Sequence, residues 1–436
     1  MRKPVMVAAL ALLLAACTNS NASDGASTTG SGAGTAAESG SPSTPAGATA
    51  TGVSGSAGAA TDPAMTESVM KVVNDMREAK HLRAVLVRVT VDGQVKVEQA
   101  VGESMTGVPA TTDMHFRNGA VAESYMSTLL LMLVDEGKVT LDDKVSTWLP
   151  DVPHADQVTL GQLVQMTSGY VDYEQLPEFT AANYAQPYKM WTPDELLSYA
   201  VDKPLWYQPG TNWNYAHTNY VILGLALEKI TGQDLNTALQ QKVLEPLGLN
   251  DTNDPGGTAI IPEPVLHAFS SERRQFLSVP ASTPLYEEAT FWNPSWTFAQ
   301  GAVQTTTLHD LSVTAEAIDS GRLLSAGSYA AMVSTDLRGN TSSVPGCGAG
   351  CFEQSVGYTY GLGVVISGNW LLQDPLFSGE SAVEAYLPSQ KIGIAVAVTY
   401  EPEAFDGTTG AYDNVADQLW RQIGIQLAPA DPPPTK

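Results

Sequence analysis

Two parts of the sequence hold side chains that could take part in the transfer of an acyl group. Ser68 and Lys71 stand at the Ser-x-x-Lys spacing, which places a hydroxyl nucleophile one helical turn from an amine. His217 can act as a general base when its imidazole is neutral, or it can hydrogen-bond a ligand carbonyl. Ser68, however, falls within a helix predicted over 65–80, ahead of the first strands. A motif counts only in its structural context, so we do not expect Ser68 to be a nucleophile.

The N-terminal residues have the pattern of an export signal. Arg2 and Lys3 precede an apolar run over 5–14 that is too short to span a bilayer. The run ends in Ala15-Ala16-Cys17, which is similar to a bacterial lipoprotein signal, cleaved before a cysteine that is then lipidated. The alternative is a plain secretory peptide with a chance cysteine. We expect residues 1–16 to be removed and Cys17 to tether an extracytoplasmic protein to the bacterial membrane or envelope.

The other two cysteines are four residues apart, in Cys347-Gly348-Ala349-Gly350-Cys351. The small intervening residues let a short loop close, and an oxidising compartment preserves a disulfide. A metal site would need further ligands, and no histidine lies close in sequence. We predict a local disulfide. We predict no metal and no cofactor, because no metal-ligand spacing, phosphate loop or dinucleotide fingerprint occurs.

The amino-acid composition separates a low-complexity segment from the domain, and the net charge argues against a nucleic-acid partner. The net charge of −24 over 436 residues argues against nucleic-acid binding, which needs clustered Lys and Arg. Residues 17–62 are almost entirely Ser, Thr, Gly, Ala and Pro, which cannot bury enough surface to offset the entropy of ordering, so we expect a flexible tether. One domain is predicted over 63–427, followed by a Pro-rich tail over 428–436.

The elements of that domain follow from local patterns. Alternating valines on both sides of Asp92-Gly93 predict a β-hairpin. The apolar stretch before Gly137 predicts a fully buried helix over 120–136, and Thr192 with Glu195 forms a capping box. Further helices are expected over 220–230, with Thr218 just before it, over 234–244 and over 412–425, and late strands over 360–366, 382–387 and 392–398. This order predicts an α+β fold, an antiparallel sheet flanked by helices, with a helical insertion over about 140–290.

The start of the buried helix, Phe116-Arg117-Asn118-Gly119-Ala120-Val121-Ala122-Glu123, resembles the nucleophile turn of serine β-lactamases and D,D-peptidases. Weaker matches follow in the family's order and extend the resemblance over about 65–425. They lie at 134–145, 158–170, 209–220, 245–248 and 361–363. The chain looks closest to the class C and D,D-peptidase/esterase branch. The resemblance implies a β-lactamase/transpeptidase-like fold.

The family's three catalytic boxes are altered at the positions that carry its chemistry. Ala120 stands where the nucleophilic serine is expected and Glu123 where the lysine is expected, while Ser124 lies a turn deeper as a packed side chain. The second box, Tyr215-Ala216-His217, keeps the tyrosine used for proton transfer. The third, Phe377-Ser378-Gly379, has lost the basic residue that engages a substrate carboxylate.

These losses favour a lipid-anchored pseudoenzyme whose cleft binds a peptide, a cell-wall fragment or another small ligand. The ligand-binding candidates are Ala120, Glu123, Tyr215, His217, Ser378 and Gly379. One alternative is a rewired esterase or peptidase that uses Glu123, Tyr215 and His217. Another is a structural protein in which Tyr215, His217 and Phe377 only pack the fold.

Overall fold

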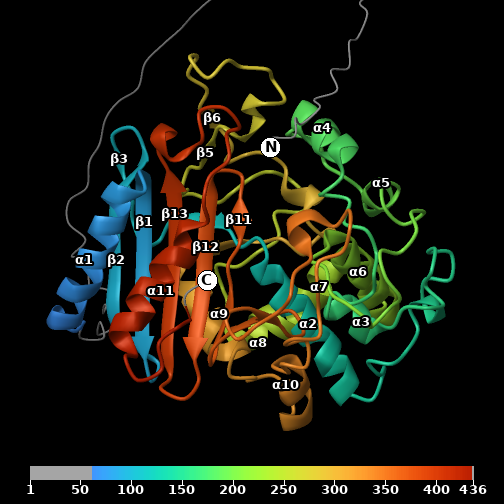
Figure 1. The fold of residues 1–436 in the computed structure, drawn as a ribbon. Helices are drawn as coiled ribbons and strands as arrows, with labels where there is room; N and C mark the ends of the chain where they lie inside the picture. Colours follow the sequence, from blue (N-terminus) through green and yellow to red (C-terminus); the bar gives the residue numbers. More distant parts are fainter. Residues whose placement is uncertain (1–60, 435–436) are drawn as a thin grey trace, which may run out of the picture. The chain divides into compact units, whose positions relative to one another are not determined.

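A nine-stranded antiparallel sheet organises the described part of the chain, residues 61–434 of the computed structural model. The strands run in the order β3-β2-β1-β13-β12-β10-β9-β8, and β11 pairs separately with β12 (Figure 1). Their bounds are β1 Leu82–Val91, β2 Gln94–Met105, β3 Val108–Pro109, β8 Thr359–Tyr360, β9 Val365–Ser367, β10 Trp370–Gln373, β11 Leu376–Phe377, β12 Glu380–Leu387 and β13 Ile392–Tyr400.

The first and last long strands lie side by side at the centre of this sheet. β1 pairs with β2 through the predicted hairpin, whose turn residues Asp92 and Gly93 have φ of 50° and 72°. Positive φ at both positions matches the twist of the flanking strands, which confirms the hairpin signal in the sequence. On its other edge β1 pairs with β13, with Val87 opposite Val396. The fold therefore closes only when both ends of the domain are present.

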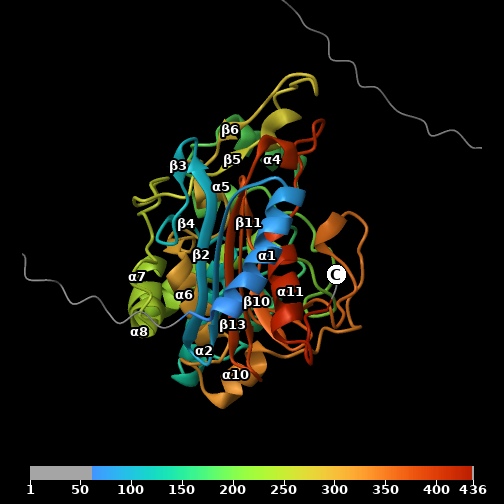
Figure 2. The ribbon, with the colours of Figure 1, turned by 90° about the vertical axis from the view of Figure 1, so that its left-hand side faces the viewer.

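Helices cover both faces of the sheet. The terminal helices α1 (Pro63–Ala79) and α11 (Val415–Leu427) contact each other and pack on one face (Figures 1 and 2). Asp62 caps α1 by accepting hydrogen bonds from the backbone N–H groups of Ala64 and Met65. On the other face lies α9 (Leu308–Ile318), which contacts α2 (Val121–Asp135). The confirmed fold class is α+β, with an antiparallel sheet and flanking helices.

The helical part of the domain lies beyond α2. Its helices are α3 Leu160–Val164, α4 Pro177–Ala185, α5 Pro193–Leu197, α6 His217–Thr231, α7 Leu235–Leu239, α8 Glu245–Leu247 and, later in the chain, α10 Ala326–Met332. Short elements complete it: strands β4 His115–Arg117, β5 Phe269–Ser270, β6 Glu287–Glu288 and β7 Thr305–Thr307, with single turns at Val145–Thr147, Glu272–Arg274, Pro294–Trp296, Gly348–Gly350 and Pro402–Ala404. The capping box of Thr192 and Glu195 begins α5, as predicted.

The helix α2 is the buried element that the sequence predicts. Every residue from 121 to 131 is buried, and Gly137 follows its end with φ of 68°. Helix α6 contacts α2 from the helical side and ends at Gly232 in the left-handed conformation. Because α2 is covered on all sides, its first turn is held at a fixed place in the core.

Four expected elements have different bounds in the structure. The strand expected over 360–366 is two short strands, because the chain turns at Gly363, where a Cβ would overlap Ser127 of α2. Helix α6 begins at residue 217, and Thr218, whose hydroxyl donates to the Val171 carbonyl, lies inside it. The helix expected over 234–244 becomes a π-helix at 240–244, and the last helix starts at Val415.

The structure describes only part of what was predicted for export. The signal peptide over 1–16, Cys17 and almost all of the expected tether lie outside residues 61–434. Among the helices of the described residues, none has the length and apolar character needed to cross a membrane. The Pro-rich tail packs on the domain, since the Trp370 indole N–H donates to the Asp431 carbonyl and Arg421 donates to that of Pro434.

Candidate functional site

The turn before α2 places Ala120 at the start of a buried helix. Asn118 fixes this turn from the side through two hydrogen bonds with Gln304, of 2.7 and 2.9 Å. Gly119 has φ of 50°, and a Cβ on it would lie 2.6 Å from the side chain of Pro375. Ala120 follows as the residue that precedes the helix, and it is partly exposed on a cavity. A methyl group thus occupies the point where this turn presents its side chain.

Glu123, one turn further into α2, is completely buried and held by three donors. Its Oε1 accepts a hydrogen bond of 2.5 Å from the Tyr215 hydroxyl. Its Oε2 accepts 2.6 Å from the hydroxyl of Tyr360 and 3.3 Å from Nε2 of Gln373. Burial raises the pKa of Glu123 to about 7, although these hydrogen bonds oppose the shift. Glu123 is therefore the acceptor at the centre of a buried polar network.

Tyr215 lies between this network and the cavity. Its ring lines the cavity while its hydroxyl points to Glu123, and its backbone N–H donates to the Gly350 carbonyl. Burial, and then the adjacent Glu123 carboxylate, raise the pKa of Tyr215 well above its usual value. At neutral pH the Tyr215 hydroxyl keeps its proton and donates a hydrogen bond to Glu123.

His217, the first residue of α6, is oriented by the buried side chain of Asp172. Nδ1 of His217 lies 3.2 and 3.3 Å from the two Asp172 oxygens, and the backbone N–H of His217 donates to Oδ1 at 3.1 Å. The ring stacks on Phe298 at 5.5 Å. Burial lowers the pKa of His217, but the Asp172, Glu174 and Glu123 carboxylates outweigh it and raise the pKa to about 9. The imidazole is therefore protonated at neutral pH.

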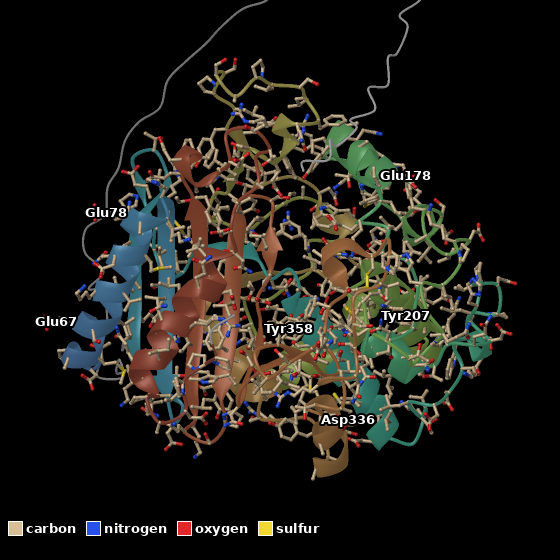
Figure 3. The ribbon with its side chains drawn as sticks, in the orientation of Figure 1. Glu67, Glu78, Glu178, Tyr207, Asp336 and Tyr358 are labelled. Carbon is tan, nitrogen blue, oxygen red and sulfur yellow. A yellow bond between two sulfur atoms is a disulfide. The ribbon has the colours of Figure 1, made fainter. Side chains whose placement is uncertain are left out.

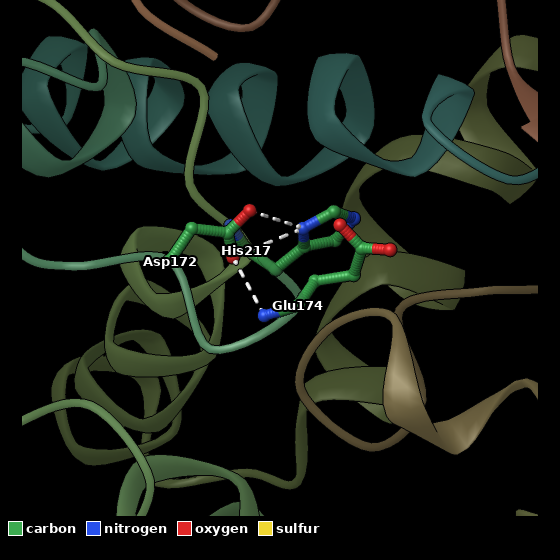
Figure 4. Close-up of side chains that lie close together, drawn as sticks. All are labelled: Asp172, Glu174 and His217. Atoms are coloured by element: carbon green, nitrogen blue, oxygen red, sulfur yellow. Dashed lines mark hydrogen bonds and ion pairs between the residues drawn. The ribbon is translucent and has the colours of Figure 1, made fainter. Parts of the chain in front are cut away.

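Glu174 adds a second carboxylate beside the same ring. Figure 4 shows Asp172, Glu174 and His217 converging from two segments, and one potential ligand atom of each lies within 4.8 Å of the others. This donor set is of a kind that binds divalent metals, which the sequence did not predict. The sequence pattern does not connect Asp172 or Glu174 with His217, since they lie 45 and 43 positions before it.

The third box forms a tight hairpin between β11 and β12. Phe377 pairs with Glu380, and the two turn residues Ser378 and Gly379 have φ of 26° and 85°. Phe377 lines the cavity and stacks on Trp296 at 5.6 Å, where the rings are 17° from parallel. Ser378 faces an adjoining hollow. Gly379 does not line the cavity; it packs against the backbone of Phe269 and donates to the Tyr412 hydroxyl.

The residues of the three boxes meet around one cavity of about 510 Å³. It is lined by Ala120, Asp172, Glu174, Gln175, Trp213, Tyr215, His217, Trp296, Thr297, Phe298, Ala349, Gly350, Phe352, Tyr358, Val365, Gln373, Asp374, Pro375, Leu376 and Phe377. Figure 3 shows Tyr358, which is partly exposed, between the sheet and the helical region in that view. The structure thus brings Ala120, Tyr215 and His217 to one surface, with Glu123 directly beneath it.

A family model described as β-lactamase matches residues 69–418, which include every residue of the three boxes. The chain belongs to the β-lactamase family. Penicillin-binding protein 4 of Amycolatopsis lactamdurans is 33% identical over 183 residues, covering 41% of this chain and 46% of that protein. Esterase EstB of Burkholderia gladioli is 30% identical over 191 residues, covering 40% and 48%. The chain therefore spans less than half the length of these curated family members.

Solved structures superpose on a larger share of the chain than these sequence matches cover. The D-amino acid amidase of Ochrobactrum anthropi superposes with a TM-score of 0.65 at 20% identity, covering 83% of this chain and 98% of that one. A D-stereospecific amidohydrolase from Streptomyces gives 0.64 at 24% identity, covering 77% and 94%. At these identities the likeness concerns the fold, which is the β-lactamase/transpeptidase-like fold that the resemblance implies.

Other nucleophile candidates lie away from the family's cleft. Ser68 and Lys71 are exposed on α1, where Ser68 donates to Gln426 and Lys71 pairs with Asp75. Ser124 is buried in α2 and donates to the Val121 carbonyl, as expected for a packed side chain. Cys347 and Cys351 form the predicted disulfide, with Cα atoms 5.8 Å apart. The loop that it closes contributes Ala349 and Gly350 to the cavity wall.

Proposed function

We propose that this member of the β-lactamase family is an exported, lipid-anchored protein that does not catalyse acyl transfer and whose cavity binds a peptide, a cell-wall fragment or another small ligand. The proposal rests on one observation above all. The turn that should present a nucleophile to the cavity presents the methyl group of Ala120. Removing the serine nucleophile of a serine protease lowers kcat by about 10⁶-fold.

The electrostatics around Ala120 support the same conclusion. A family tyrosine can accept a proton only if nearby positive charge lowers its pKa, and here Glu123 brings negative charge instead. The basic residue of the third box is replaced by Phe377, whose ring is stacked on Trp296. Nucleophile, proton acceptor and carboxylate anchor are thus altered together, while a cavity large enough for a small ligand is kept.

Covalent labelling tests the loss of acyl transfer directly. Purified protein is incubated with a fluorescent penicillin and, separately, with a fluorophosphonate, and its intact mass is measured. We expect the mass to stay unchanged. An adduct mapped by peptide sequencing to a residue of the cavity would overturn the proposal. An adduct on exposed Ser68 would be recognised because the Ser68→Ala variant, which leaves the cavity unchanged, would no longer be labelled.

The lipid anchor is tested separately. The proposed cleavage before Cys17 follows from the sequence Ala15-Ala16-Cys17. Expressed in a bacterial host, the wild-type chain should partition into the detergent phase and incorporate labelled fatty acid. Cys17→Ser should remain in the aqueous phase. Equal partitioning of the two proteins would count against a lipid on Cys17.

One observation favours a second candidate, the rewired hydrolase. Asp172 fixes the orientation of His217 in the way that a buried carboxylate orients a catalytic histidine. Because the pKa of His217 is about 9, such an enzyme would gain activity as pH rises through 9 and the imidazole becomes neutral. Hydrolysis of p-nitrophenyl acetate, measured between pH 6 and 10, should then be lost in His217→Ala and in Glu123→Gln. Activity that persists in both variants would exclude this route.

A further inference from the structure

Most of the charged side chains that line the cavity are carboxylates. Its lining includes the carboxylates of Asp172, Glu174 and Asp374, with His217 as the one residue able to carry positive charge. Two adjoining hollows share Leu376 with the cavity and add the carboxylate of Glu272. No Lys or Arg lines any of these three hollows in the described part of the chain. Protonated His217 offsets one of these carboxylates, and the remaining carboxylates leave the groove with a net negative charge that attracts cations.

The two carboxylates beside His217 differ in what they can still bind. Asp172 accepts hydrogen bonds from the backbone N–H groups of Glu174 and His217, and from the imidazole. Within residues 61–434, the hydrogen bonds of Glu174 involve only its backbone: its N–H donates to Asp172 and its carbonyl accepts from the Thr180 hydroxyl. Its pKa is raised by burial, which His217 partly offsets and Asp172 reinforces. Glu174 is thus a partly buried acceptor with capacity for a positively charged donor.

Aromatic rings form the wall next to this carboxylate. Trp296 contacts both the cavity and the adjoining hollow that Glu174 lines, and its centroid lies 5.8 Å from that of His217. Phe377 extends the same wall through its stack with Trp296. The faces of aromatic rings attract organic cations and also bury apolar carbon, so this wall and Glu174 favour the same kind of ligand.

We infer that the cavity selects an organic cation, whose ammonium group binds beside Glu174 and whose apolar body packs on Trp296 and Phe377. The inference rests on the proposed function, in which the cavity binds a ligand without acylation. A bare metal ion fits less well, because Asp172 already accepts hydrogen bonds from four donors: the imidazole and backbone N–H of His217, the backbone N–H of Glu174 and the side-chain amide of Gln175. The 510 Å³ volume also suits an organic molecule.

Three small molecules of similar size differ mainly in charge: phenethylamine is cationic, N-acetylphenethylamine is neutral and 3-phenylpropionate is anionic. Comparing them separates the effect of charge from the effect of shape. Binding to the purified wild-type chain is measured by calorimetry and by saturation-transfer NMR at pH 7. We expect phenethylamine to bind at least about tenfold more tightly than either of the others, a factor that corresponds to about 1.4 kcal/mol. Equal or tighter binding of the neutral or anionic molecule overturns the inference, as does the absence of phenethylamine binding at millimolar concentration.

Variants assign the preference to Glu174. Glu174→Gln should remove the tenfold advantage, and Glu174→Lys should reverse it in favour of 3-phenylpropionate. The matched control is Glu178→Gln, which removes an exposed carboxylate four residues away on α4 (Figure 3). Thermal unfolding checks that each variant is folded. An unchanged preference in both Glu174 variants overturns the inference.

Two further results are informative. Stoichiometric Mn²⁺ or Zn²⁺ binding that excludes phenethylamine and is lost in Glu174→Gln would assign the site to a metal and overturn the ammonium assignment. Covalent labelling by penicillin would instead overturn the proposed function, whatever the amine result. The failure of one proposal can thus be told from the failure of the other.

Discussion

The hydroxyl of Tyr215 donates a 2.5 Å hydrogen bond to the buried carboxylate of Glu123. This hydrogen bond joins Glu123 of the first box to Tyr215 of the second, and the Tyr215 hydroxyl carries the proton. Glu123 is also bound by Tyr360 and Gln373, so the pair belongs to a satisfied network. Restoring a nucleophile alone would leave Tyr215 protonated.

The first prediction follows from that pairing. Ala120→Ser alone should remain unreactive toward a fluorescent penicillin, because Tyr215 still donates to Glu123 and cannot take the serine proton. Ala120→Ser with Glu123→Lys should acquire slow labelling, since a lysine would replace the anion with a cation and lower the pKa of Tyr215. Intact-mass spectrometry checks both variants. Equal labelling of the single and double variants would show that Glu123 does not control the proton on Tyr215.

The second prediction concerns the titration of Glu123. Its folded-state pKa of about 7 lies above the unfolded value of about 4.3, so its contribution to stability is complete below about pH 4.3 and is lost as pH rises through 7. Glu123→Gln should cost less than about 1 kcal/mol at pH 5, because Glu123 is itself protonated there and offers, like an amide, one donor group and one acceptor oxygen. The cost should shrink by pH 8. Urea unfolding at both pH values checks this, and a pH-independent difference would contradict it.

Local signals explain what the sequence could predict. The hairpin at Asp92-Gly93, the capping box of Thr192 and the glycine after α2 each depend on residues within a few positions, and all three are present. The strand expected over 360–366 is broken because Gly363 meets Ser127, a residue far away in the sequence. Such contacts between distant segments leave no local pattern.

The same distinction applies to the site. Ala120, Tyr215 and Phe377 could be placed on one cavity because each lies within a recognisable family motif. Asp172 and Glu174 belong to no motif that the sequence presented, and only the fold brings them to His217. The network around Glu123 was missed for the same reason, since Tyr360 and Gln373 come from the last third of the chain.

The third prediction concerns His217. Its folded-state pKa of about 9 exceeds the unfolded value of about 6.5, so its contribution to stability is complete below pH 6.5 and is lost as pH rises through 9. Asp172→Asn removes the largest of the interactions that raise this pKa, so the pKa should fall. NMR of the imidazole protons follows the titration directly. Glu178→Gln serves as the control, because its exposed carboxylate pairs with Lys203 and not with His217. An unchanged His217 titration in Asp172→Asn would contradict the assignment.

The fourth prediction concerns two acidic side chains that do not line the cavity. Asp319, at the end of α9, and Glu384, on β12, are both buried and interact with each other, and none of their four carboxylate oxygens has a hydrogen-bond partner among residues 61–434. Burial raises the pKa of both groups well above the usual range, and for Glu384 the neighbouring Asp319 carboxylate adds to the shift. The pair therefore stabilises the fold while it is protonated. Its contribution is complete below about pH 4 and is lost as pH rises through the folded-state values.

Glu384→Gln should consequently stabilise the protein at alkaline pH. The amide can donate to Asp319, so the contact is kept while one of the two buried charges can no longer form. We expect the free energy of unfolding to rise by about 1–2 kcal/mol at pH 9 and to change little at pH 5. Glu316→Gln is the matched control, because Glu316 lies on α9, the helix that ends before Asp319, but is only partly buried. Urea unfolding followed by tryptophan fluorescence measures both variants. A loss of stability at pH 9 in Glu384→Gln would show that the ionised pair is compensated by contacts other than those described.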